Sequence, residues 1–563
     1  MKKKLLFISV LLHSIICFSQ VLNINIEAHK FNIDKNEALI ISQIEHIENY
    51  TNITSAYNAI SITLNKKDYL FTALPEQLTY TNSYTVTDPE TATNYTLYFT
   101  ALPLIAITSE NTIVDEPKVY ANFYYADDEQ VLTSKIGIEI RGGISQYYPK
   151  KTYDLEFWED ELGEETHNVY FGDLRSDDDW IIDALYNEPL RLRSYTANKL
   201  WLEIHTPTYL DEEPDAKSGA DVNYVEVFLN GSYNGVYNLS EQVDKKQLEL
   251  KSYKDNLRGE LFKGVGRGAS TFTDLPNYDN STDLWSGYEV KYPKADDIID
   301  WSNIYGFTDF VMNSTEADFK TNIWNSFNND NYIDYFIFLN LIRATDNTGK
   351  NIYIAKYTTD EPYFYVPWDL DGCFGTIWDG SNENITNDIL TNGFMSRVLE
   401  LNPDNIADDI SNRWFTLRQD LLSNETLLQS ISDRYNFLKS NNIYEREALV
   451  YSNYNFSEDD LSYTLTWLEN RLTYLDTYFE KVLSVQDTSL ETKKLNIYPN
   501  PAKNRLNISN NIKLNGKTFK IYNNIGQLSS EGIIDNNAIT IEDLQSGLYF
   551  LNIESITYKF IKN

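Results

Sequence analysis

The chain has 563 residues, of which 42% are hydrophobic and 14% aromatic, and its formal net charge is −36. This length predicts about three or four domains, and the apolar content is enough to bury several cores, which excludes global disorder. The strong negative charge repels phosphate backbones, so we expect no nucleic-acid partner.

The first twenty residues read MKKKLLFISVLLHSIICFSQ. Three lysines precede an apolar run that is too short to span a membrane, which is the pattern of a removed secretory signal. We therefore assign residues 1–20 to a signal peptide and expect the mature chain to start at Val21. Lipid attachment at Cys17 is the alternative, but Ile16 stands where a small residue is needed. No later apolar run is long enough for a transmembrane segment.

Residues 21–100 alternate apolar and polar positions in runs such as VLNINIEA and YTLYFTAL, which predicts an N-terminal β-sandwich-like module. The β-rich pattern continues to about residue 300. It is interrupted by a helix predicted in RLRSYTANKLWLEI (191–204) and includes a hairpin turning at Asn230 and Gly231. Helical spacing then dominates, as in NYIDYFIFLNLIR (331–343). We expect a β-rich lobe followed by a helical lobe.

Acid and amide side chains flank two strands predicted in NIYIAKY and YFYVP: Asp346, Asn351, Asp369 and Asp371. A hairpin made by these strands brings their ends together on one side. Oxygen ligands without a nearby histidine suit Mg²⁺ or Mn²⁺ bridging phosphates better than zinc. Protein kinases use the same order of parts: an Asp, an Asn five residues later, a pair of strands and another Asp close to a glycine.

The spacing of Asp346 and Asn351 is a weak signal by itself. Ala344 and Thr345 stand where kinases have His and Arg before the catalytic Asp. TDNTGKN is rich in turn-forming residues, so a purely structural loop is one alternative. A calcium loop at DLDG is another, but the third acid and the terminal glutamate of an EF-hand are missing.

The stretch RGGISQYYPKKTYDLEF places two glycines before Lys150 and Lys151 and then an alternating strand. A turn that covers phosphates, followed by a strand lysine, is the arrangement expected at a nucleotide site. Strand parity favours Lys151, which shares a face with Tyr153, but leaves Lys150 open, and both could be solvated lysines. The helix at 191–204 offers no inward glutamate as partner, so either Glu241 or no residue fills that role.

Three stretches, RGGISQYYPKKTYDLEF, YVEVFLNGSYNGVYNLSEQVD and NIYIAKY with YFYVPWDLDGCFG, together resemble the spore-coat protein H (CotH) kinase family over residues 101–484. The resemblance implies an atypical protein-kinase-like fold. Its implied activity is transfer of phosphate from ATP, with Mg²⁺ or Mn²⁺, to Ser or Thr hydroxyls of secreted or surface proteins. The alternative is an inactive kinase-like surface adhesin or glycan-binding scaffold, which the many tyrosines and tryptophans would suit.

The resemblance also implies roles for individual residues. Asp346 would be the catalytic base. The metal ligands would be Asn351 with Asp369 and Asp371, and which aspartate is the main ligand stays open. The ATP-binding residues would be Arg141, Lys150, Lys151 and Glu241.

A polar linker is expected at residues 485–494, and residues 495–563 alternate short strands with proline and glycine turns, which predicts a C-terminal β-sandwich. LNIYPNPAKNRLNIS and the strands after it resemble the type A C-terminal sorting domain of the type IX secretion system. This implies periplasmic transit, engagement of the type IX machinery, and release or attachment at the cell surface. An ordinary binding module is the alternative. We therefore expect a secreted, multidomain α+β protein.

Overall fold

The computed structural model describes residues 20–484, except 255 and 455, and residues 496–563, except 510–513, 515, 524–526, 536 and 554–555. The chain divides into two compact units, Met1–Leu483 and Ser484–Asn563. The predicted linker at 485–494 and residues 1–19 of the predicted signal peptide lie outside the described residues. Within the described ranges, no helix combines the length and the apolar character that crossing a membrane requires.

The N-terminal module is one mixed sheet of seven strands in the order β1-β4-β5-β6-β7-β3-β2. Its strands are β1 (Val21–Ile26), β2 (Phe31–Asp34), β3 (Leu39–Gln43), β4 (Ala59–Leu64), β5 (Lys67–Phe71), β6 (Ser83–Thr87) and β7 (Asn94–Thr100), with the short helix α1 (Ile53–Ala56) before β4. We predicted a sandwich-like module, and one continuous sheet forms instead. Alternation locates strands but not their partners. Parallel pairs of β1 with β4 and of β3 with β7, together with antiparallel pairs between the other neighbours, join the seven strands into one sheet.

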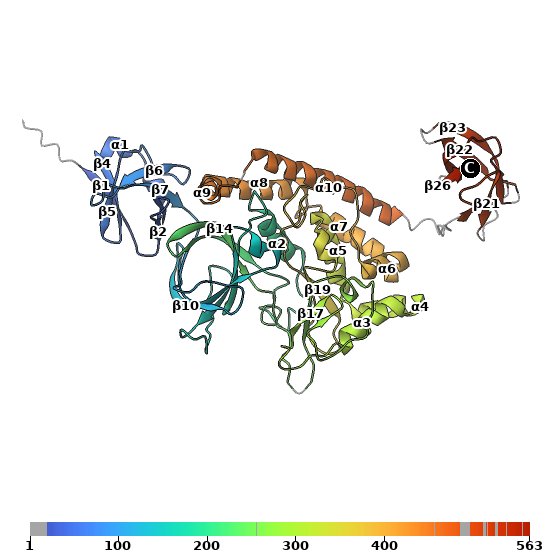
Figure 1. Cartoon of the computed structure of the whole chain (residues 1–563), viewed down its shortest axis with the longest axis horizontal. Helices are drawn as coiled ribbons and strands as arrows, with labels where there is room; N and C mark the ends of the chain where they lie inside the picture. The colour runs from blue at the N-terminus through green and yellow to red at the C-terminus, as the bar shows by residue number, and fades with distance from the viewer. Residues whose placement is uncertain are drawn as a thin grey trace, which may run out of the picture. The chain divides into compact units, whose positions relative to one another are not determined.

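A closed barrel follows, in the order β10-β11-β12-β14-β13-β8-β9. Its strands are β8 (Leu104–Thr108), β9 (Val119–Ala126), β10 (Val131–Arg141), β11 (Thr152–Trp158), β12 (Asp179–Asp183), β13 (Val222–Leu229) and β14 (Ser232–Glu241). Figure 1 shows the barrel nearly end-on, with α2 (Arg193–Ile204) beside it. The helix predicted at 191–204 is thus confirmed. So is the hairpin of β13 and β14, where Asn230 and Gly231 both have positive φ.

The helical lobe, residues 260–484, contains a five-stranded sheet in the order β16-β17-β15-β18-β19. These strands are β15 (Glu260–Gly264), β16 (Leu284–Trp285), β17 (Tyr288–Tyr292), β18 (Ile352–Lys356) and β19 (Tyr363–Pro367). The helices are α3 (Ser302–Asn313), α4 (Glu316–Ser326), α5 (Asn329–Ile342), α6 (Gly393–Leu401), α7 (Ile406–Leu417), α8 (Asn424–Ser440), α9 (Ile443–Val450) and α10 (Glu458–Ser484). Helix α5 confirms the helix predicted at 331–343.

Helix α5 places the candidate site. The side chain of Asn328 caps its first turn by accepting from the Asn331 N–H at 2.9 Å, and every residue from Asn331 to Ile342 is buried. Arg343 ends the helix with a left-handed backbone (φ 52°). The chain therefore leaves the core at a fixed point and enters the short 3₁₀ turn Thr345–Thr348, which carries Asp346.

Helix α9 joins the three parts of the larger unit. Arg446 donates to Glu226 of the barrel at 2.5 Å, and its guanidinium lies over the ring of Tyr98 in the N-terminal sheet. One apolar cluster is shared by that sheet and the barrel: Leu39, Ile41, Tyr98, Leu104, Phe228 and Tyr233. The N-terminal module is therefore packed into the larger unit rather than tethered to it.

The C-terminal unit has two sheets around one apolar core. One sheet contains β20 (Asn496–Tyr498), β21 (Arg505–Ser509) and β24 (Ala538–Thr540). The other contains β22 (Thr518–Asn523), β23 (Leu528–Ile533), β25 (Gly547–Ile553) and β26 (Ile556–Lys562). The predicted C-terminal β domain is confirmed.

Candidate active site

The hairpin predicted between Asn351 and Asp369 forms. Strands β18 and β19 pair in antiparallel register from Ile352 opposite Pro367, and the Trp368 N–H donates to the Asn351 carbonyl at 3.1 Å. Asn351 and Asp369 therefore lie at the same open end of the hairpin. Both have a left-handed backbone with φ of 54°, which is uncommon for residues other than glycine and is often found at functional sites.

Asn347 holds this open end together, and the sequence analysis did not single it out. Its amide nitrogen donates to the carbonyls of Asn351 at 2.6 Å and Trp368 at 2.7 Å, and its side chain is almost fully buried. The Tyr335 hydroxyl of α5 donates to the Asn347 carbonyl at 2.7 Å. The turn that carries Asp346 is thereby fixed to the hairpin that carries Asp369.

The three predicted aspartates lie in different surroundings. Asp346 is paired with Lys350 at 3.6 Å. The Asp369 side chain is open to solvent, yet the protein atoms around it raise the pKa of its carboxyl, while Lys263 and Arg141 oppose the rise. Asp371 accepts from the Asn187 amide at 2.6 Å, and burial together with the Asp369 charge raises its pKa well above the usual value.

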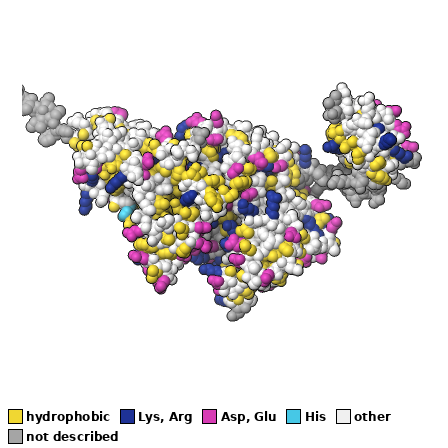
Figure 2. Space-filling model, in the orientation of Figure 1, with side chains coloured by type: hydrophobic (Ala, Val, Ile, Leu, Met, Phe, Trp, Pro, Cys, Tyr) yellow, Lys and Arg dark blue, Asp and Glu magenta, His cyan; other side chains and the backbone are white. Residues whose placement is uncertain are grey.

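Two cations face these acids from different lobes. Lys263 of β15 is half-buried, and burial together with Arg141 and Lys291 lowers its pKa to about 8. Arg141 ends β10 of the barrel, where it contacts Asp154 at 3.3 Å and its guanidinium lies 5.5 Å from the Trp368 ring centroid. Figure 2 shows a notch between the barrel and the helical lobe with side chains of both charges on its walls.

Lys150 lies elsewhere, inside the protein. Its ammonium donates to the Glu447 carboxylate of α9 at 2.7 Å, and Glu447 also accepts from Arg191 at 3.0 Å and from the Val236 N–H at 2.7 Å. Burial lowers the pKa of Lys150 to about 8, and Glu447 opposes that fall. The lysine therefore has an acidic partner, on a helix almost 300 residues away in sequence.

Lys151 and Glu241 are also bound by protein groups. Lys151 donates to the backbone carbonyls of Gln146 and Tyr148, which closes the turn after β10. The fully buried Glu241 accepts from the Arg175 N–H at 2.8 Å and from Lys217 at 2.5 Å. Its other oxygen accepts from the Asp221 N–H and the Gln247 amide. The charge of Arg141 acts on Asp369, while Lys150, Lys151 and Glu241 are each held by other protein groups.

Cys373 directly follows residues 369–372, the acidic turn that carries Asp369 and Asp371. Its side chain is fully buried, its thiol donates to the Leu370 carbonyl at 3.1 Å, and burial raises the pKa of the thiol well above its usual value. It supports the turn and offers no thiolate for chemistry.

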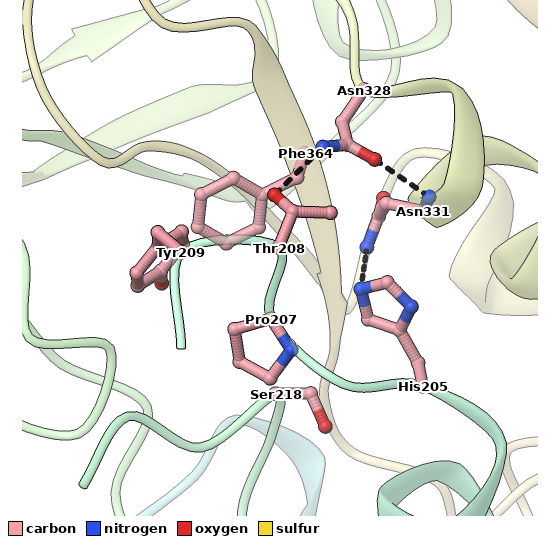
Figure 3. Close-up of a pocket in the computed structure, with 8 residues that line it drawn as sticks. All are labelled: His205, Pro207, Thr208, Tyr209, Ser218, Asn328, Asn331 and Phe364. Carbon is pink, nitrogen blue, oxygen red and sulfur yellow. Dashed lines mark hydrogen bonds between the residues drawn. The ribbon is translucent and has the colours of Figure 1, made fainter. Parts of the chain in front are cut away.

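A small cavity near α5 is structural. Its volume is about 10 Å³, and Figure 3 shows hydrogen bonds joining Thr208, Asn328, Asn331 and His205 in its lining. Asn328 donates to Thr208 at 3.0 Å, and the Asn331 amide lies 3.1 Å from His205 Nε2. His205 Nδ1 is also 2.9 Å from Asp334. The space has about the volume of one water molecule, so it is not a substrate site.

Residues 138–475 match the family model of the CotH kinase protein. The chain belongs to this family. Residues 496–563 match the model of the secretion system C-terminal sorting domain. The CotH kinase domain therefore includes the end of β10, the barrel strands that follow it and nearly all of the helical lobe, and the function of this region is kinase-like.

Comparison with curated protein sequences found no match. Among solved structures, the CotH kinase chain is similar to the crystal structure of a Helicobacter pylori proinflammatory kinase, CtkA. The identity is 11%, the TM-score is 0.21, and the match covers 67% of this chain and 96% of that one. The sorting domain marks the CotH protein for type IX secretion, so the protein is secreted or held at the cell surface.

Proposed function

We propose that the CotH kinase domain transfers the γ-phosphate of ATP to Ser or Thr hydroxyls of exported or surface proteins. The observation that carries the proposal is the meeting of Asp346, Asp369 and Asp371 with Lys263 and Arg141 where the barrel adjoins the helical lobe. Such a site combines acidic residues, which can bind a metal ion or act as a base, with cationic residues, which can bind phosphates.

The acidic turn fits a divalent cation. Asp371 accepts from two neutral donors, the Asn187 amide and the Gly372 backbone N–H, and Asp369 has no hydrogen-bonding partner among the described residues, so neither carboxylate has a cation bonded to it. Hard oxygen ligands of this kind suit Mg²⁺ or Mn²⁺. Asp369 and Asp371 would hold the cation, with the Asn351 amide as a further oxygen ligand. When bound, the cation would neutralise charge on the phosphates.

Each remaining group has a task in the transfer. Asp346 would accept the proton of the acceptor hydroxyl, whose oxygen forms a bond to the γ-phosphorus. The bond from that phosphorus to the β,γ-bridging oxygen breaks, and ADP leaves. Lys263 and Arg141 would contact phosphate oxygens. We place phosphate binding on them because the Lys150 side chain is fully buried, and Lys151 and Glu241 are held by protein partners.

Labelled ATP with Mg²⁺ or Mn²⁺ and a serine-rich acceptor tests the activity. The parent should transfer label, and Asp346→Asn should lower the transfer rate at least about 100-fold while keeping the rise in melting temperature that Mg²⁺ and ATP produce. Glu445→Gln, on the exposed face of α9, is the matched control and should behave as the parent. A parent with neither transfer nor nucleotide-induced stabilisation would support the inactive scaffold instead.

A further inference from the structure

A polar row crosses the outer wall of the barrel towards the acidic turn. Arg141 lies opposite Thr152, and Asp183 lies opposite Asn238. The Thr152 hydroxyl donates to Asp183 at 3.2 Å, which joins the two pairs into one row. Residues directly opposite one another in antiparallel strands project from the same face. Asp183 and Asn238 therefore share the face from which Arg141 reaches the ring of Trp368.

Two contacts hold this wall against the acidic turn. Arg141 contacts Trp368, which immediately precedes Asp369. At the other end, Asn187 in the loop after β12 donates to Asp371 at 2.6 Å and to the Trp378 carbonyl at 3.0 Å. In sequence, Asp183 lies between Arg141 and Asn187, the two residues that make these contacts. The Asp369 charge adds to the effect of burial in raising the pKa of Asp183, while Thr152, the Leu185 N–H and Arg141 oppose the rise.

Asn238 supplies a second, independent observation. Its side chain is 1% exposed, and within the described residues neither its amide oxygen nor its amide nitrogen has a hydrogen-bonding partner. Leaving a buried polar group unpaired destabilises the folded state. A buried amide with both atoms unused beside an acid is what a site for an ion or its bound water contains.

We propose that Asp183 and Asn238 form the barrel side of the divalent-cation site, so that the cation held by Asp369 and Asp371 ties the barrel to the helical lobe. The inference rests on the proposed function, from which it takes the cation. Mg²⁺ binds few carboxylates directly and keeps several water molecules, so Asp183 and Asn238 can act through those waters. Metal binding would then add to the contacts that already hold the barrel against the helical lobe.

A second acidic group on the barrel has a different character. Asp177, Asp178 and Asp179 form the trio of carboxylates in the described chain whose oxygens all lie within 4.8 Å of one another. Lys246 already pairs with Asp177 and Asp178, and Arg175 pairs with Asp177. It therefore needs no added cation, and Asp179, four residues before Asp183 on the same strand and face, provides a matched control.

Calorimetric titration of the full chain with Mn²⁺ alone tests the site. Asp183→Asn should weaken Mn²⁺ binding at least about tenfold and remove most of the Mn²⁺-induced rise in melting temperature. Asp179→Asn should leave both quantities as in the parent. Asn238→Leu should weaken Mn²⁺ binding but leave the metal-free protein as stable as the parent or more so, because it removes an unpaired buried amide.

Hydrogen exchange tests the link between the lobes. Mg²⁺ should slow exchange at residues 183–187 and 368–372 in the parent, but only at 368–372 in Asp183→Asn. Parent-like Mn²⁺ affinity in Asp183→Asn, or loss of binding in Asp179→Asn alone, would overturn the inference. If the inference is overturned but Asp369→Asn abolishes Mn²⁺ binding, the proposed function stands without the inference. If Asp369→Asn binds Mn²⁺ like the parent, the metal assignment of the proposed function fails.

Discussion

Glu447 is the acid on which two buried cations depend. Lys150, Arg191 and Glu447 are all at most 1% exposed, and Lys150 and Arg191 contact different oxygens of the Glu447 carboxylate. Burial alone would raise the pKa of Glu447, but Lys150 and Arg191 bring it below its usual value. The carboxylate is therefore ionised, and it balances the charge of the two buried cations.

Glu447→Ala should lower the free energy of unfolding by about 3–5 kcal/mol, because it leaves two buried cations without their acid. Urea denaturation at neutral pH measures this. Glu445→Ala on the exposed face of the same helix should change stability by less than about 0.5 kcal/mol. Equal effects of the two substitutions would show that the buried ion pairs contribute nothing specific.

Asp179 gives the protein a pH dependence. Burial and the neighbouring Asp178 raise its pKa to about 7. Between pH 4 and pH 7 the folded state therefore holds more protons than the unfolded state, and stability falls as pH rises. Asp179→Asn should remove this loss. The free energy of unfolding of the variant should therefore rise by about 2–4 kcal/mol relative to that of the parent between pH 4 and pH 7.5. Urea titrations at several pH values measure the difference, and a constant difference would contradict the assignment.

At the scale of elements, the N-terminal sheet and the barrel share a core. Ile41 of β3 is fully buried in the cluster that includes Phe228 and Tyr233 of the barrel hairpin. The Tyr233 N–H also donates to Asp34 of β2 at 2.9 Å. Loosening β3 should therefore loosen β13 and β14.

Ile41→Ala should destabilise the larger unit by about 2–4 kcal/mol and speed hydrogen exchange in β13 and β14 as well as in β3. Leu70→Ala, on an exposed position of the same sheet, is the control and should leave exchange in the barrel unchanged. Faster exchange confined to the N-terminal sheet would mean that the two elements unfold independently.

Local patterns predicted the elements near the site well. The hairpin of β18 and β19, helix α5 and the Asn230–Gly231 turn were all visible in the sequence, since each depends on residues close together in the chain. The single N-terminal sheet was not visible, because its parallel pairs join strands far apart in sequence.

Long-range partners explain what the sequence analysis missed. Glu447 reaches Lys150 from almost 300 residues away, and no local pattern marks such a pair. Lys263 follows an ordinary strand pattern, and only sheet order places β15 next to β18. Asp183 and Asn238 become neighbours through barrel register, and a shift of one residue would turn Asp183 to the opposite face.

At the scale of the whole molecule, the chain consists of two units with separate cores. Calorimetry of the full chain should therefore show two unfolding transitions. A chain ending at Ser484 should retain the transition of the larger unit within about 2 °C. A single transition, or a marked fall in that melting temperature, would show that the sorting domain stabilises the kinase domain.

The burial of Cys373 has a consequence for export. A thiol that stays protonated and cannot be reached by another sulfur reacts slowly in thiol–disulfide exchange, whatever the redox potential around it. Folded molecules will therefore not become cross-linked to one another through Cys373 in an oxidising environment, and the sulfur beside the acidic turn remains in its reduced form.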